Sequence, residues 1–441
     1  MGVPGLLPFL KRRYTSAFPT IGGKYDHIYS DSNALLYPLA ATTVDPREIA
    51  RLLLEVAQEY HVVYGGIVHL FIDGPAAMGK IRHQRLRRFQ YPPLTFKQNP
   101  DGTYGTWTQA IFTPGTPQMK MINEYIEEHM KEYPGVGSFS SSDIPGEGEH
   151  KLVAAAKHLP SNTKIAFISP DADMILLGMG MLEHDITILR HYAEDDDKRY
   201  GATHEMYHVN CTLLRSLITS DMKTESIWNF IIPTFFVGND FIPPIPQTSE
   251  IFKALPKIIR KRARVYDTRT KSIYWKGIFS LLQSLSDSPI DDKWVGKISD
   301  TIVFDTLYYT KYFPFSIDRY KMVQQWIITV EWIFQYYHNG LDIASRSWQY
   351  NNTVSPTIHT ILDIGIDAVK NLDIAVEQVP PLSSHQALAA ALPPWLHSLL
   401  PEDMREKTEK IPQYYPFSFK MDNSLSIPII PTIPYSVIRN I

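Results

Sequence analysis

Three short segments near the start of the chain predict its architecture: YDHIYS (25–30), PREIARLLLEVAQEY (46–60) and IVHLFI (67–72). The first and third are rich in β-branched and aromatic residues, which favour strands. The middle segment starts as a helix should, because Asp45 can cap it, Pro46 suits its first position and Glu48 completes a capping box. Its apolar residues recur at helical spacing, so one face is buried. This strand–helix–strand pattern predicts neighbouring parallel strands.

The same alternation continues to about residue 190. Two more strands are predicted at Lys164–Ser169 and Ile186–Arg190, and helices at Thr116-Pro117 and after Pro145-Gly146. We therefore expect an α/β fold, with a parallel or mixed central sheet flanked by helices.

The second half of the chain has a different pattern. After about residue 245, helical stretches and proline-rich segments replace the alternation. We expect an α/β domain at 1–250 and a mostly helical, loop-rich block at 251–441 packed on it. The 441 residues are 44% hydrophobic, which is ordinary for a globular chain. The formal net charge of −3 excludes a global positive field, so nucleic-acid affinity requires local patches.

Cysteine usage and hydropathy exclude several classes of protein. The single cysteine, Cys211, excludes a disulfide framework and a cysteine-based zinc site within one chain. It is compatible with a reducing compartment, and we expect a cytoplasmic protein, with the nucleus as the alternative. No apolar run approaches the roughly 20 residues of a membrane span. The first residues, MGVPGL, have no signal-peptide core.

Acidic side chains occur where predicted strands end and in glycine turns. The carboxyl ends of parallel strands meet at one edge of a sheet, so these side chains converge if the strands are neighbours. Glycines around two of the acids, in PGEGEH (145–150), loosen the turn so that both can face inward. Taken singly, each acid is more often a helix cap or a turn former. The set comprises Asp31, Asp73, Glu147, Glu149, Asp171, Asp173 and Asp240.

The chemistry that suits such a set is metal-assisted hydrolysis. Crowded carboxylates repel one another unless cations neutralise them. Oxygen ligands suit Mg²⁺ or Mn²⁺. Two such ions about 3.5–4 Å apart would activate water and stabilise the leaving oxygen of a phosphodiester. We therefore predict a site for two ions of Mg²⁺, or of Mn²⁺.

A basic run, KIRHQRLRR (80–88), adds a second feature. On a helix, one stripe of its surface is formed by Lys80, Gln84, Arg87 and Arg88. The preceding strand end at Asp73 places this stripe near the acids, where it could hold a terminal phosphate. The alternative is a solvated basic face.

Three further patterns are weaker. GPAAMGK (74–80) nearly matches a P-loop, but Ile81 replaces the required Ser or Thr. HEMYH (204–208) matches a zinc-protease motif that requires a helix, whereas its surroundings favour a short strand. The basic cluster Lys257–Lys271 could follow a nucleic-acid backbone, form a solvated face or act as a nuclear signal.

The order of the motifs resembles that of the XRN family of 5′→3′ exoribonucleases. The resemblance runs from residue 1 nearly to the end of the chain. It is carried by MGVPGL at the start, SDSNALLY (30–37), IDGPAAMGKIRHQRLRRF (72–89), DIPGEGEHK (143–151), SPDADMILLG (169–178), GNDFIPPIP (238–246) and VEWIFQYYHNG (330–340).

The resemblance implies a PIN/FEN-like nuclease core that removes mononucleotides processively from 5′-monophosphorylated single-stranded RNA. It assigns the seven acids to the metal site and the basic stripe to the 5′-phosphate. The block 251–441 would close the active site. The first base would stack between Tyr37, where the family has His, and Trp348. The enzyme would act as a monomer, after a decapping enzyme. Family members in cells are usually longer, which suggests a compact form, such as a viral one.

Two other functions stay open at this point. One is a structure-specific 5′ DNA flap-type nuclease, and the other is a catalytically idle RNA-binding relative. Flap nucleases carry a glycine-rich motif for duplex DNA after the last acid. Here Asp240 is followed by FIPPIPQTSE, which has no glycine and favours RNA.

Overall fold

The computed structural model describes the chain except for residues 1, 21, 192–205, 247, 249–250, 261–263, 287–289, 293–295, 299, 314–316, 341–344, 371–376 and 423–426. The chain forms two compact units. Unit 1 comprises Met1–Thr15, Asp171–Gly180 and Leu213–Gln378, and unit 2 comprises Ser16–Pro170, Met181–Thr212 and Val379–Ile441. The chain thus enters each unit more than once. The single boundary predicted at residue 250 stays a prediction.

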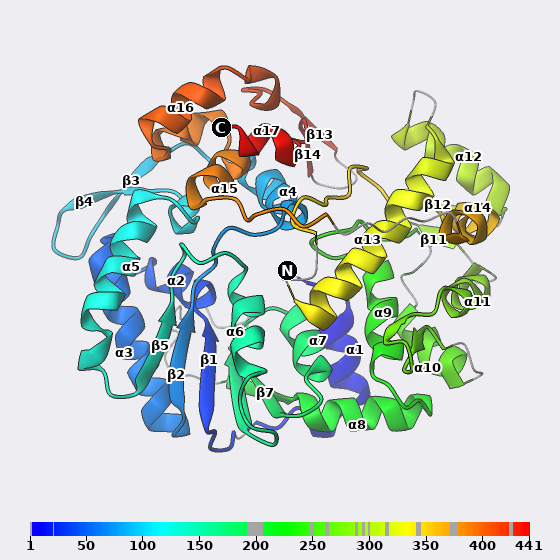
Figure 1. Cartoon of the computed structure of the whole chain (residues 1–441), viewed down its shortest axis with the longest axis horizontal. Helices are drawn as coiled ribbons and strands as arrows, with labels where there is room; N and C mark the ends of the chain where they lie inside the picture. Colours follow the sequence, from blue (N-terminus) through cyan, green and yellow to red (C-terminus); the bar gives the residue numbers. More distant parts are fainter. Residues whose placement is uncertain are drawn as a thin grey trace. The chain divides into compact units, whose positions relative to one another are not determined.

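Unit 2 is built on a six-stranded sheet with the strand order β5-β2-β1-β6-β7-β8 (Figure 1). Its strands are parallel except for β8, which runs antiparallel to β7. The predicted α/β class is confirmed, and so are all four predicted strands. Strand β5 was not predicted, because its sequence VGSFS is polar and lies at the sheet edge. The strands are β1 His27–Asp31, β2 Ile67–Phe71, β5 Val136–Ser140, β6 Lys164–Ile168, β7 Asp185–His191 and β8 Met206–Asn210.

Helices cover both faces of this sheet. Helices α2 (Asn33–Leu39), α3 (Pro46–Tyr64) and α5 (Pro117–His129) bury their apolar sides against one face and form the largest core of the unit. Helix α6 (Gly148–Ala156) packs on the other face, against β1 and β2. The sheet is therefore enclosed in the way a parallel sheet requires.

The predicted helix starts are largely confirmed. The Asp45 side chain accepts a hydrogen bond from the Arg47 backbone N–H at 3.0 Å and so caps α3. The predicted capping box at Glu48 is wrong. Both carboxylate oxygens of Glu48 accept instead from Arg51, at 2.8 and 2.7 Å, because that guanidinium lies one turn further along the helix and offers two donors.

The last residues of the chain form a second core of unit 2 around α4 (Met78–Arg88). Apolar side chains from 382–441 enclose one face of that helix. The proline-rich end of the chain therefore packs on a core. The elements are α15 Ser384–Ala391, α16 Glu402–Glu409, α17 Tyr435–Arg439 and the short strands β13 Lys420–Asp422 and β14 Ile427–Ile429. A separate hairpin is formed by β3 Thr95–Gln98 and β4 Tyr104–Trp107.

Unit 1 is mostly helical, with long α13 packed against α14 and α7. The Glu331 carboxylate on α13 is largely buried and accepts a 2.6 Å hydrogen bond from the Trp275 indole. Among the described residues, no helix is both long and apolar enough to cross a bilayer. The helices are α1 Leu6–Arg13, α7 Asp173–Gly180, α8 Cys211–Met222, α9 Trp228–Thr234, α10 Ile251–Arg260, α11 Trp275–Ser286, α12 Thr301–Tyr312, α13 Arg319–Asn339 and α14 Ile358–Lys370. Short strands form two hairpins, β9 Tyr266–Asp267 with β10 Ser272–Ile273, and β11 Ile290–Asp292 with β12 Gly296–Ile298.

Candidate metal and phosphate site

Two of the predicted carboxylates lie at the ends of neighbouring strands in unit 2. Asp31 is the last residue of β1 and pairs in register with Phe71 of β2, two residues before Asp73. The Asp31 carboxylate lies 3.4 Å from the Ser169 hydroxyl, which directly follows β6. The Asp73 backbone N–H donates at 2.7 Å to the Asn33 side chain on α2. The carboxyl ends of β1, β2 and β6 therefore meet, as the sequence predicted.

A glycine turn brings the start of α6 onto these two aspartates. The Gly148 backbone N–H donates to Asp73 Oδ1 at 2.7 Å. A Cβ at Gly148 would lie 3.0 Å from Asp31 Oδ1 and 3.4 Å from Asp73 Oδ1, so a larger residue would crowd both carboxylates. Gly146 has a positive φ of 117°, a conformation that favours glycine. The two glycines thus have the role that the sequence suggested.

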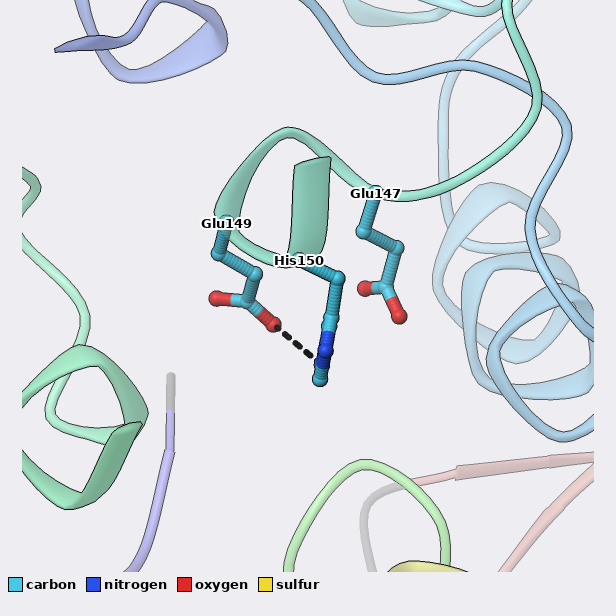
Figure 2. Close-up of side chains that lie close together, drawn as sticks. All are labelled: Glu147, Glu149 and His150. Carbon is cyan, nitrogen blue, oxygen red and sulfur yellow. Dashed lines mark ion pairs between the residues drawn. The ribbon is translucent and has the colours of Figure 1, made fainter. Parts of the chain in front are cut away.

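Three buried side chains at this turn form a group that could hold a metal ion. The carboxylates of Glu147 and Glu149 and the ring of His150 place one donor atom each within 4.8 Å of one another. Figure 2 shows the ring between the two glutamates. Glu147 and Glu149 are 2% and 7% exposed, so their charges are costly unless cations balance them.

His150 was missing from the predicted site, because the search of the sequence was for the oxygen ligands that Mg²⁺ prefers. The only feature of the sequence that could have indicated His150 as a ligand is its position directly after Glu149. Burial, and then the Lys80 and Lys157 ammonium groups, hold the pKa of His150 well below its usual range. The ring is therefore neutral near pH 7, which is the form that binds metals. Two carboxylates and one neutral imidazole fit a divalent cation.

The basic stripe meets this group through one ion pair. Lys80 Nζ, on α4, lies 2.5 Å from Glu147 Oε2, and both side chains are largely buried. Two turns further along α4, the Arg88 guanidinium donates to the Gln84 side chain at 3.0 Å. Burial lowers the pKa of Arg88 from its ordinary value, with the nearby Tyr37 and Tyr91 opposing this effect. Lys80 and Arg88 are thus drawn into the protein, whereas Arg87 is exposed.

Tyr37, the predicted stacking residue, belongs to the same neighbourhood. It lies on α2 and contacts Phe112 edge-on, with ring centroids 5.1 Å apart. Its surroundings raise the pKa of the phenol chiefly by burial, while the charges of Arg88 and Arg87 lower it. Even so, 37% of the residue is exposed. Part of the ring is therefore accessible beside the basic stripe.

The other predicted site residues belong to unit 1. Asp171 follows β6 in the chain by three residues, and Asp173 begins α7. A Cβ on Gly2 would lie 3.1 Å from Asp173 Oδ1, so the N-terminal glycine packs against this carboxylate. The Trp348 indole donates to the Thr329 hydroxyl on α13 at 3.1 Å. Whether these residues, with Asp240, converge on the acids of unit 2 stays a prediction.

Neither the P-loop-like motif at 74–80 nor the zinc-protease-like motif at 204–208 has the geometry that the chemistry of such motifs needs. The Gly74 backbone N–H donates to Gly146 O at 2.8 Å, so it does not face a free phosphate cradle. His208 lies in strand β8, as expected, whereas a zinc-protease motif needs a helix. His204 and Glu205 lie outside the described residues, as does part of the basic cluster Lys257–Lys271.

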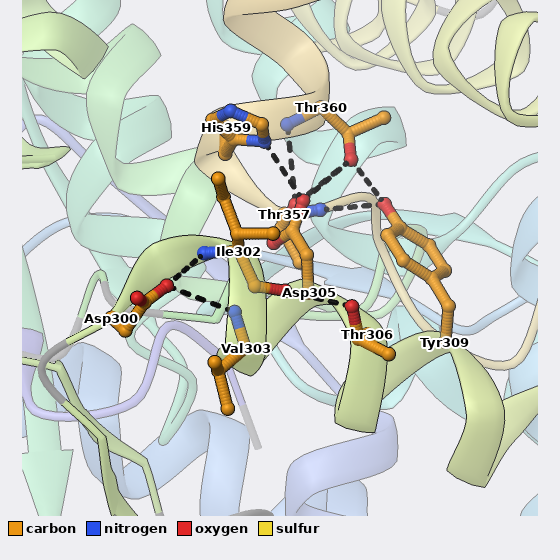
Figure 3. Close-up of polar contacts among 9 residues, drawn as sticks. All are labelled: Asp300, Ile302, Val303, Asp305, Thr306, Tyr309, Thr357, His359 and Thr360. Carbon is orange, nitrogen blue, oxygen red and sulfur yellow. Dashed lines mark hydrogen bonds and ion pairs between the residues drawn. The ribbon is translucent and has the colours of Figure 1, made fainter.

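One polar network of unit 1 was not predicted. Asp305 on α12 is 4% exposed, and its Oδ2 lies 3.0 Å from His359 Nδ1 and 3.2 Å from the Thr360 hydroxyl (Figure 3). The Tyr309 hydroxyl donates to the same Thr360 hydroxyl at 2.9 Å. An Asp–His pair can support catalysis, but these groups gather at the first turn of α14. A carboxylate there stabilises the helix N-terminus, so we assign the network a structural role.

Comparison with protein families gives a match over the first part of the chain. Residues 1–192 match the model described as the XRN 5′-3′ exonuclease N-terminus. These residues are similar to that N-terminal region and are called the XRN segment below. The XRN segment contains the basic stripe, Tyr37 and every predicted acid except Asp240. Trp348 also lies beyond it. The six-stranded sheet with flanking helices is consistent with the nuclease core of this family.

Individual relatives extend the similarity. The 5′-3′ exoribonuclease 1 of Saccharomyces cerevisiae is 25% identical over 59% of this chain and 20% of its own length. The human 5′-3′ exoribonuclease 1 is 22% identical over 96% of this chain and 32% of its own length. The 5′-3′ exoribonuclease 2 of Debaryomyces hansenii is 23% identical over 65% of this chain and 38% of its own length. The chain thus spans between a fifth and two fifths of these relatives.

Proposed function

We propose that this chain is a metal-dependent 5′→3′ exoribonuclease that removes mononucleotides processively from 5′-monophosphorylated single-stranded RNA. The ion pair between Lys80 and Glu147 carries the proposal, because it joins a basic stripe to a buried carboxylate–imidazole group. A terminal phosphate on that stripe would lie beside the metal ligands. The names of the relatives support the reaction and its direction.

The cofactor proposed is Mg²⁺, or Mn²⁺, with two ions bound. Glu147, Glu149 and His150 have the donor atoms for one ion. Asp31 and Asp73 face the same glycine turn and would contribute to the pair. Three acids of unit 1 would complete the set, namely Asp171, Asp173 and Asp240. Bound metal would supply an activated water and neutralise charge on the scissile phosphodiester.

The remaining side chains bind and orient the RNA. Arg87 and Arg88 would pair with the 5′-phosphate, and the hydrogen bond from Arg88 to Gln84 fixes one of the two guanidinium groups. Because Lys80 and Arg88 are largely buried, the stripe suits a monophosphate better than a cap or a triphosphate. Tyr37 would stack on the first base through its exposed part, and Trp348 would cover the other side of that base.

A substrate panel tests this function. The purified protein is incubated with one RNA sequence carrying a 5′-monophosphate, a 5′-hydroxyl or a cap, with Mg²⁺ and with EDTA. We expect mononucleotides from the monophosphate form only, and no reaction in EDTA. Asp73→Asn should abolish the reaction, whereas the matched change Asp101→Asn, on the exposed β3–β4 turn, should leave it unchanged. Equal degradation of all three RNAs, or faster cleavage of branched DNA, would refute the proposal.

The setting of the reaction is also a proposal. RNA with a 5′-monophosphate arises when a cap has been removed, so the enzyme would act after a decapping activity. We propose that it does so as a monomer in the cytoplasm. The sequence has a single cysteine, Cys211, and its side chain is buried, which agrees with a reducing compartment.

A further inference from the structure

Arg85 lies in the middle of the basic run but points into the protein. It is 3% exposed, on helix α4. Its guanidinium donates to the backbone carbonyl of Ala390 at 3.0 Å and to that of Tyr414. The guanidinium carbon lies 4.5 Å from the Phe89 ring centroid and 5.1 Å from that of Tyr415. Arg85 therefore holds two separate parts of the C-terminal segment at once.

Burying the charged Arg85 side chain costs free energy of desolvation, which a residue that only filled space would not need. Among the described residues, no carboxylate forms an ion pair with Arg85, so carbonyl groups and ring faces alone balance its charge. Burial lowers the pKa of Arg85 to about 10, so it still carries a charge near pH 7. A leucine or a methionine would fill the same space without the cost of desolvation. What an apolar residue could not supply is the fixed direction of two hydrogen bonds.

The position of Arg85 on α4 links it to the predicted phosphate site. Met78, Ile81 and Arg85 share the face that packs into the core formed with 382–441. Lys80, Gln84 and Arg87 lie on another face of the same helix. Because a helix is rigid, the two carbonyls that fix Arg85 also fix the rotation of α4 about its axis. They thereby fix the direction in which the basic stripe points.

We propose that Arg85 is a positioning residue that couples the C-terminal segment 379–441 to the binding of the RNA 5′-phosphate. The segment acts as a brace: it sets the orientation of α4, and α4 presents the basic stripe. This inference rests on the proposed function. It adds that the preference for a 5′-monophosphate depends on residues that do not touch the RNA.

Three variants of the full chain test the brace. Arg85→Met keeps the length and packing but removes the donors, and Arg85→Lys keeps the charge but removes the paired geometry. Arg405→Met on α16 is the matched control, because this arginine is only partly buried. For Arg85→Met we expect KM for 5′-monophosphate RNA to rise about tenfold, the size of one charge-assisted contact, with kcat nearly unchanged. The inhibition constant of 5′-hydroxyl RNA, added as a competitor that is not degraded, should stay the same, and Arg85→Lys should recover part of the loss.

Amide hydrogen exchange of the RNA-free protein gives an independent readout. In Arg85→Met, exchange should accelerate across α4 and 384–415 but not in β1 or β2. If Arg85→Met weakens the binding of 5′-monophosphate RNA and of the 5′-hydroxyl competitor equally, or if α4 exchanges as in the wild type, the brace is refuted. If the wild type itself shows no preference for 5′-monophosphate RNA, the proposed function fails, while hydrogen exchange still decides whether Arg85 holds α4.

Discussion

Replacing Gly148 with alanine tests the geometry of the acidic site with a single methyl group. The added Cβ would lie 3.0 Å from Asp31 Oδ1, 3.2 Å from Phe71 O and 3.4 Å from Asp73 Oδ1. The first two contacts are tighter than ordinary van der Waals packing and the third is at its lower limit, so the Asp31 carboxylate above all must move by a few tenths of an ångström. The backbone at Gly148 is helical and accepts alanine, so the effect comes from crowding and not from backbone strain.

The expected magnitude follows from what the methyl group displaces. It presses on two proposed metal ligands and on the 2.7 Å hydrogen bond from the Gly148 N–H to Asp73. Changes beside metal ligands typically cost about 10–100-fold in metal affinity. That range corresponds to about 1.4–2.8 kcal/mol. We expect a similar rise in the Mg²⁺ concentration that gives half-maximal activity, with part of the lost rate recovered at saturating Mg²⁺.

The assay is the rate of mononucleotide release from 5′-monophosphate RNA across a Mg²⁺ titration. Direct Mn²⁺ binding to RNA-free protein complements it. The matched control is Gly23→Ala in the same unit, because a Cβ at Gly23 meets nothing within 4 Å. If Gly148→Ala and Gly23→Ala have the same metal dependence, then Asp31 and Asp73 do not share a metal site at this turn, and the reasoning is refuted.

Two further predictions concern stability in unit 1. Burial raises the pKa of Glu331 to about 7, so its stabilising contribution is lost as the pH rises from about 4.5 through 7. At pH 8 the free energy of unfolding of Glu331→Gln should therefore exceed that of the wild type by at most about 3 kcal/mol, with no gain at pH 4.5; if the stabilities of the two proteins change in parallel with pH, the prediction is wrong. Asp305→Ala removes the shared acceptor shown in Figure 3 and should cost about 2–3 kcal/mol in denaturant unfolding, with RNA cleavage at low temperature retained. A loss below about 0.5 kcal/mol would show that solvent replaces the network.

Sequence reasoning identified the elements of the sheet because each carries a local signal. Strands β1, β2, β6 and β7 are short apolar runs, and α3 has a cap and a buried stripe at helical spacing. Strand β5 lacks such a run and was missed, since it is polar and pairs with only one neighbour. The prediction of a capping box was wrong for a related reason. Glu48 could accept from the Asp45 backbone N–H or from Arg51, and the local sequence does not show which of the two it binds.

The candidate site was predictable to the extent that topology determines it. Parallel strands end at one edge, so Asp31 and Asp73 had to meet once their strands were neighbours. The two glycines at 146 and 148 indicated that the glutamates between and after them could turn inward. What the sequence did not show is that Lys80 pairs with Glu147, because this contact depends on how α4 packs in three dimensions. The net charge of −3 conceals this pairing of opposite charges.

Arg85 shows most clearly where local reasoning ends. Within a run of basic residues, a mid-helix arginine is expected to face solvent or a phosphate, and nothing in its neighbours' spacing distinguishes it from Arg87 or Arg88. Its partners lie 305 and 329 residues away along the chain. Only the packing of the C-terminal segment on α4 determines that Arg85 is the arginine held by two carbonyls of that segment. A phosphate-binding stripe predicted from spacing alone is therefore incomplete, because the residue proposed to orient it is not part of the stripe.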